Sequence, residues 1–80
     1  MDIVRLREEQ TTEIVIGMAR GHSAEVLKEI GRTRADCLRR FGEAAAPLGV
    51  IEEQRRALRL AEAALRLRED LDRANGCQRY

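Results

Sequence analysis

The chain has few of the residues that build a dense globular core. Its only aromatic residues are Phe41 and Tyr80, it has no tryptophan, and it is 80 residues long. A chain this short buries only a small fraction of its surface and often needs a staple or a partner. Thin, elongated packing of the kind found in a helical hairpin or bundle fits this composition.

Reactive side chains are equally scarce. The only histidine is His22, and the two cysteines are Cys37 and Cys77. This set gives no metal-ligand spacing and no arrangement for nucleophilic catalysis, and no polar groups converge as they do in an enzyme. We therefore expect a protein that is not an enzyme, with no catalytic, cofactor-binding or metal-binding residue. We interpret Cys37 as a small hydrophobic residue on an apolar helix face.

The sequence also has no long apolar run and no excess of one charge. Fifteen basic residues face fourteen acidic ones, for a net charge of +1. Without a secretory segment or a membrane-spanning run, we expect no membrane insertion. The balanced charge likewise predicts no nucleic-acid partner. Arginine supplies every basic residue except Lys28, which together with many alanines indicates a GC-rich bacterial source. Two cysteines without a secretory segment indicate a protein of the reducing cytoplasm.

Three breaks divide the chain, at Gly21-His22-Ser23, Pro47-Leu48-Gly49 and Asn75-Gly76. They predict one small helical domain over 1–80, with an N-terminal segment over 1–20 and helices over 23–46 and 48–75. A short break between two long helices makes them antiparallel. The predicted fold is therefore all-α, an antiparallel hairpin of two long helices preceded by a shorter N-terminal helix.

The N-terminal segment is open to more than one interpretation. Thr11-Thr12 and Ile14-Val15-Ile16 are mostly β-branched and weaken helix propensity. The segment is then either a short helix followed by an extended turn or a stretch that orders only on a partner.

Two apolar stripes run along the predicted helix over 48–75. When the sequence is wound at about 100° per residue, one stripe faces the preceding helix and the other is left over. The first predicts a hairpin core made of Ile30, Leu38, Phe41, Ile51, Leu58 and Leu65. The second predicts a partner-binding face made of Leu60, Ala64, Leu67 and Leu71. Alternatively, Ile14 and Met18 of the N-terminal segment cover the second stripe and close a three-helix bundle.

Acidic and basic residues alternate on the remaining surface of this helix. Glutamates at positions 52, 62 and 69 each precede an arginine by four residues, at 56, 66 and 73. This spacing predicts three exposed ion pairs, each worth a few tenths of a kcal/mol.

From Gly21 to about Leu71 the chain resembles the YscE-type family of small bacterial type III secretion co-chaperones. The resemblance rests on a Ser23-capped helix through Ala35-Asp36-Cys37, the Pro47 break, and a last helix that opens with Gln54-Arg55-Arg56-Ala57-Leu58. Members of that family form helical hairpins that pair with a tetratricopeptide-like chaperone. Together the two proteins hold the needle subunit soluble in the bacterial cytoplasm.

The resemblance implies that the leftover stripe docks on such a chaperone and, through it, serves a needle subunit. Without that partner we expect a homodimer through the same stripe, because a two-fold interface needs only self-complementarity. The alternative function is a self-contained dimeric helical regulator or scaffold, which would touch nucleic acid through arginines of the helix over 23–46.

Overall fold

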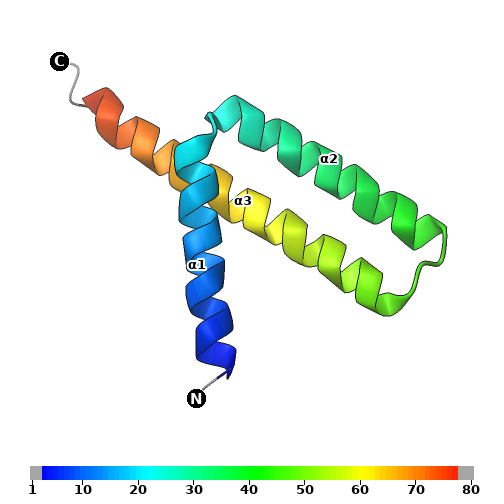
Figure 1. Ribbon diagram of the computed structural model, residues 1–80. Coiled ribbons are helices and arrows are strands. Elements are labelled where there is room, and N and C mark those ends of the chain that lie inside the picture. The colour runs from blue at the N-terminus through cyan, green and yellow to red at the C-terminus, as the bar shows by residue number, and fades with distance from the viewer. Residues whose placement is uncertain (1–2, 78–80) are drawn as a thin grey trace.

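The computed structural model describes the backbone of residues 3–77 and the side chains of residues 10–76. This part of the chain is all-α, with helices α1 (Ile3–Gly21), α2 (Ala24–Glu43) and α3 (Leu48–Cys77), and it contains no strand (Figure 1). The helices have 19, 20 and 30 residues. The predicted fold class, a hairpin of two long helices after a shorter first helix, is confirmed.

Helix α1 continues without a break through Thr11-Thr12 and Ile14-Val15-Ile16, the residues whose β-branched side chains weaken helix propensity. The backbone stays helical from Ile3 to Gly21, with no extended turn after Thr12. A β-branched residue costs only a few tenths of a kcal/mol in a helix, and burial of apolar side chains easily outweighs this. Ala19, near the end of α1, is fully buried against the rest of the chain. The expectation of a short helix followed by an extended turn is therefore wrong.

Helix α2 begins at the cap that the sequence predicts. Ser23 has an extended backbone, and its hydroxyl oxygen accepts a hydrogen bond of 3.2 Å from the backbone N–H of Val26. Its carbonyl accepts another of 3.0 Å from Leu27. Glu25 in the first turn adds a negative charge where the helix dipole favours one.

Helix α2 ends at Glu43, three residues before the predicted end at 46. Ala45 takes a left-handed conformation, with φ of 53°. The N–H of Ala46 then donates to the carbonyl of Phe41 at 3.0 Å, and the N–H of Ala45 donates to Gly42 at 3.2 Å. These two bonds form a Schellman motif, which satisfies carbonyls at the helix end.

Pro47 explains both this early end and the start of α3. A proline disfavours helical geometry in the residue before it, so Ala46 cannot extend α2. The carbonyl of Pro47 accepts hydrogen bonds from Val50 at 3.0 Å and Ile51 at 3.2 Å, which starts α3. At its far end α3 continues to Cys77, so the predicted end at 75 is wrong.

The three helices form a flat, open arrangement. Helix α2 lies antiparallel alongside α3, whereas α1 crosses α3 and diverges from α2 (Figure 1). The molecule measures 52 × 36 × 14 Å, and its radius of gyration is 15.1 Å. A compact domain of this length has a radius of gyration of about 12 Å. The closed three-helix bundle is therefore not the fold of this chain.

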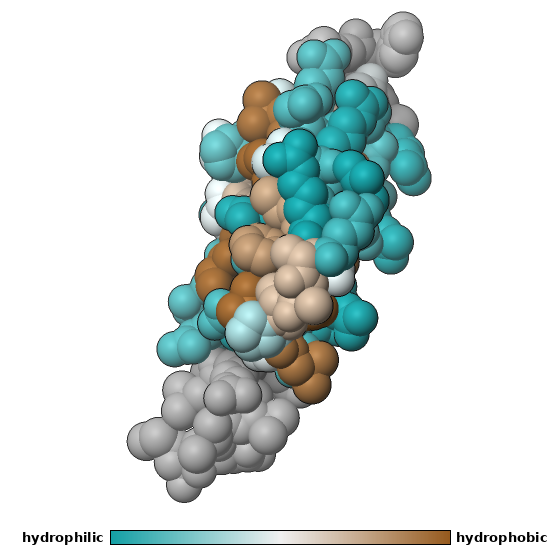
Figure 2. All heavy atoms as spheres, turned by 90° about the vertical axis from the view of Figure 1, so that its right-hand side faces the viewer, coloured by the Kyte–Doolittle hydropathy of each residue, from teal (hydrophilic) through white to brown (hydrophobic). Residues whose placement is uncertain are grey.

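The core is small and is built mainly from alanine. Among the described residues, four are fully buried hydrophobic ones, namely Ala19, Leu27, Ala61 and Ala64. An alanine side chain is small, so a core built mainly from alanine buries little apolar surface. On the face shown in Figure 2, hydrophobic side chains form a band through the middle, with hydrophilic side chains on both sides of it.

The left-handed residue at the end of α2 predicts an unusual stabilising substitution. Ala45→Gly should raise the free energy of unfolding by about 0.5–1 kcal/mol, because glycine adopts this conformation without a Cβ clash. The melting temperature should rise by several degrees at fixed protein concentration. Ala44→Gly is the control, because Ala44 has an ordinary φ of −78°. A lower melting temperature for Ala45→Gly would show that the motif does not form.

Candidate partner-binding surfaces

The predicted hairpin core lies along the contact between α2 and α3, where its side chains are only partly buried. Five of its residues are half-buried: Ile30, Leu38, Ile51, Leu58 and Leu65. Phe41 is 38% exposed and lies near the end of α2. The most buried large side chain of the described chain is that of Leu27, which the six-residue prediction omitted. The sequence does indicate this residue, because Leu27 lies eleven residues before Leu38 and that spacing places both side chains on one helix face.

The predicted partner-binding face of α3 is divided by α1. Leu60 and Leu67 are half-buried, and Leu71 is 38% exposed. Ala64 is fully buried, so its side chain belongs to the core of this chain and not to a partner-binding face. The cause is the crossing helix, since Val15 of α1 and Leu60 of α3 line the same shallow groove.

Arg68 fastens the end of α1 to α3. Its Nη1 atom donates a 3.3 Å hydrogen bond to the carbonyl of Ala19, which belongs to the last turn of α1. Its Nη2 atom lies 3.0 Å from Oδ1 of Asp72. The last four carbonyls of a helix have no intrahelical donor, and the negative end of the helix dipole favours a cation. Arg68 therefore supplies both a donor and a positive charge where α1 needs them.

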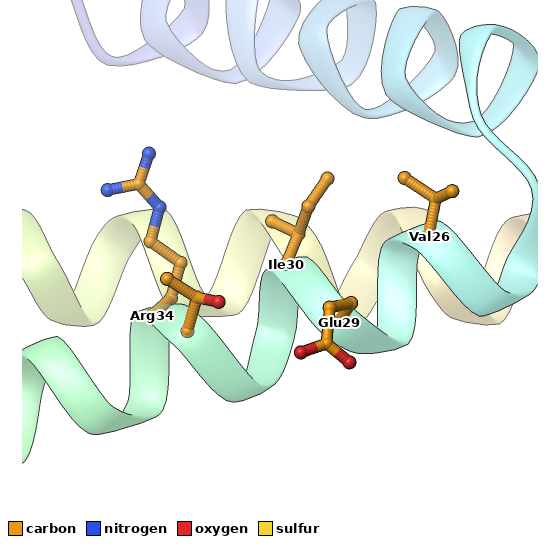
Figure 3. A pocket seen from close by; sticks show the side chains of 5 residues that line it. Val26, Glu29, Ile30 and Arg34 are labelled. Atoms are coloured by element: carbon orange, nitrogen blue, oxygen red, sulfur yellow. The ribbon is translucent and has the colours of Figure 1, made fainter.

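A further uncovered apolar line lies on α2. Val26 is 44% exposed and Phe41 is 38% exposed, and Ile30 and Cys37 between them are half-buried. Figure 3 shows Val26 and Ile30 projecting from α2 toward the side where α1 lies in that view. Two separate shallow grooves follow one another along the helix. We call this line the α2 stripe; its members are Val26, Ile30, Thr33, Cys37, Phe41 and Ala44.

Sequence reasoning missed the α2 stripe because it treated the apolar residues of α2 as a single face. The signal was present in two adjacent pairs, Val26-Leu27 and Cys37-Leu38. Neighbouring residues in a helix are about 100° apart, so one member of each pair faces α3 and the other faces elsewhere.

Charged residues on α2 form a short local network. Asp36 accepts a 2.6 Å hydrogen bond from Nη2 of Arg39, and its other oxygen lies 3.0 Å from Nε of Arg40. The hydrogen bond from Arg39, together with the two positive charges, holds the pKa of Asp36 below its ordinary value. This carboxylate therefore stays ionised across the physiological range.

The three ion pairs predicted on α3 are not formed. Within the described side chains, none of these glutamates lies within 4.0 Å of its predicted arginine. Arg73 instead lies 3.8 Å from Asp70, and Arg68 pairs with Asp72. Exposed pairs of this spacing gain so little that solvation of each charge competes with them.

Comparisons of the chain with protein-family models, with curated proteins and with solved structures found no match. No group of three or more potential metal ligands occurs among the described residues. In the same part of the chain, no helix is both long enough and apolar enough to cross a membrane.

Arg68→Met should loosen α1 while leaving the hairpin intact. The change removes the hydrogen bond to Ala19 and the charge at the end of α1, and should cost about 1 kcal/mol. Hydrogen exchange should quicken at the amides of α1 and stay unchanged in the contact between α2 and α3. Arg66→Met is the matched control, because Arg66 is exposed and forms no ion pair among the described residues. Equal exchange in both variants would contradict the anchoring role.

The pKa of Asp36 should depend on Arg39. An NMR titration should find it below about 3.9, the ordinary aspartate value, and Arg39→Ala should move it upward. Because the folded-state pKa is the lower one, the stabilisation is complete above the ordinary value and is lost as the pH falls through the lowered one. A pKa that is unchanged by Arg39→Ala would contradict the assigned cause.

Proposed function

We propose that this protein is a helical co-chaperone of the type III secretion kind. In this role it pairs with a tetratricopeptide-like chaperone in the bacterial cytoplasm and so keeps a needle subunit soluble. The proposal rests on one observation, which is that the chain by itself leaves far more surface uncovered than a finished monomer does. The resemblance to the YscE-type family supplies the class of partner.

The amount of uncovered surface supports the proposal. A compact monomer of 9.1 kDa exposes about 4,900 Å² of solvent-accessible surface, whereas this chain exposes 6455 Å². The excess of roughly 1,500 Å² is larger than the 800 Å² or so that one partner buries in a standard interface. Several large apolar side chains contribute to it: Ile14, Ile16, Val26, Phe41, Leu48 and Leu71.

The C-terminal end of α3 is the surface that best fits a concave helical-repeat partner. Helix α3 has ten more residues than α2, so about 15 Å of it extends past the hairpin (Figure 1). Leu71 lies on this extension and is 38% exposed. A protruding helix end with an apolar residue suits the groove of a solenoid, which binds helices by their apolar face.

A chaperone of this kind gains stability by mass action. A ligand present at about 100 times its dissociation constant contributes roughly 2.7 kcal/mol to the protein that it binds. That contribution is a large fraction of the stability of an ordinary domain. Occupying the groove also removes an apolar patch that would otherwise associate.

Co-expression with a tetratricopeptide-like chaperone of a type III secretion system tests the proposal. The wild-type chain should raise the soluble yield of that chaperone several-fold and co-purify with it. Leu71→Glu should abolish both effects without loss of helix content by circular dichroism, since an unpaired carboxylate would be buried in the interface. Leu48→Glu should behave like wild type, because Leu48 is exposed at the opposite end of α3.

Two results would contradict the proposal. One is an unchanged yield of the chaperone with the wild-type chain present. The other is equal loss of binding in the Leu71→Glu and Leu48→Glu variants. Either result in a chain that folds and dimerises by itself would favour a self-contained dimeric regulator or scaffold.

A further inference from the structure

We propose that the shallow groove between α1 and α3 binds an acidic peptide segment of a partner protein. We call it the α1–α3 groove; its lining residues are Thr11, Val15, Arg56, Arg59, Leu60 and Ala63. This groove is separate from the protruding end of α3, so the binding does not depend on the proposed function.

The α1–α3 groove joins an apolar part to a positively charged part. Val15 and Leu60 are half-buried, and Ala63 beside them is exposed. Arg56 and Arg59 are exposed and lie three residues apart on α3, which makes them neighbours on the helix surface. One ligand can therefore gain apolar contact and two positive charges at the same place.

The charges of these two arginines are not used within the chain. No ion pair or hydrogen bond joins the side chain of Arg56 or Arg59 to another described residue. Arginines on α2 do find carboxylates, since Arg39 lies 2.6 Å from Asp36. The α1–α3 groove thus offers two guanidinium groups whose donors are open to a ligand.

Positive charge is concentrated along the flank of α3 that borders the groove. When α3 is wound at about 100° per residue, four exposed arginines and two exposed glutamates share this flank over residues 52–66. They are Arg55, Arg56, Arg59 and Arg66, with Glu52 and Glu62. Glu13 of α1 lies on the far face of that helix, about 160° around from Val15. The whole chain has a net charge of only +1, so complementarity favours a negatively charged ligand at this flank.

The form of the groove favours a peptide over other anions. Its volume of about 400 Å³ is at the lower end for ligand sites, and a shallow groove does not enclose a small molecule. None of its lining residues is aromatic, so it has no platform on which the bases of a single strand could stack. Planar arginine donors match carboxylates, and arginine clusters recur in the recognition of acidic peptide motifs.

Alternation of acidic and apolar residues would suit both parts of the groove. In an extended peptide, successive side chains point to opposite sides. The apolar side chains can then contact Val15 and Leu60, while the long side chains of Arg56 and Arg59 reach the carboxylates beside them.

Binding of a synthetic peptide to the full chain tests the proposal. The probe is a dye-labelled hexapeptide of alternating glutamate and leucine, followed by fluorescence anisotropy. The wild type should bind it with a micromolar dissociation constant. A second peptide with glutamine in place of glutamate should bind at least tenfold more weakly, because the charge-assisted hydrogen bonds are lost. No binding of the first peptide, or equal binding of both, would overturn the proposal.

Matched variants locate the charged part of the site. Arg56→Gln with Arg59→Gln should weaken binding at least tenfold while helix content is kept, since glutamine is a good helix former. The control is Arg32→Gln with Arg73→Gln, which removes the same charge from two side chains that are each 77% exposed and lie outside the groove. The control should bind like wild type, and equal weakening in the two variants would overturn the proposal.

A third variant tests the apolar part. Ala63→Gln places a longer polar side chain in the groove and should weaken binding at least tenfold, whereas Ala74→Gln, at another exposed position of α3, should not. Unchanged binding in Ala63→Gln would show that the peptide attaches by charge alone and would overturn the groove as its site. Tighter binding of a single-stranded oligonucleotide than of the acidic peptide would overturn the kind of partner.

Discussion

The crossing of α1 over α3 is the contact on which the rest of the structure depends. It is fastened by Arg68, which donates a hydrogen bond to the carbonyl of Ala19, and the side chain of Ala19 is fully buried. Helix α1 packs on a side of α3 that α2 does not cover, and it diverges from α2. An apolar stripe of α2 is therefore left uncovered. A helix that had instead folded down along the hairpin would have closed a bundle and left no stripe.

Binding surfaces follow from this openness. Helix α3 is long enough to meet two neighbours and still extend beyond both, and α2 is packed on one side only. The α2 stripe and the protruding end of α3 are separate surfaces of the molecule. A partner bound to one of them would leave the other uncovered.

Much of the fold was predictable because its signals are local. Ser23 as a cap, Pro47 as a break and the two-sided apolar pattern of α3 each act within a few residues. The direction of α1 was not predictable, since periodicity shows which face is apolar but not which neighbour it meets. The left-handed Ala45 was missed because alanine carries no turn signal. The prediction placed Ala64 on a partner-binding face, whereas its side chain is fully buried. Periodicity did not show this, because it does not tell which neighbour covers that face.

Spin-label distances between α1 and α2 within one chain test the account most directly. Gln10 of α1 and Ala35 of α2 are both exposed, and a chain with Cys37→Ser and Cys77→Ser allows these two positions to be labelled alone. Because α1 and α2 diverge from their junction at Ser23, labels at positions 10 and 35 should lie much farther apart than a second pair at Arg20 and Lys28, close to the junction. A closed bundle would run α1 antiparallel along α2 and place positions 10 and 35 side by side, so a short distance between these two labels would contradict the account.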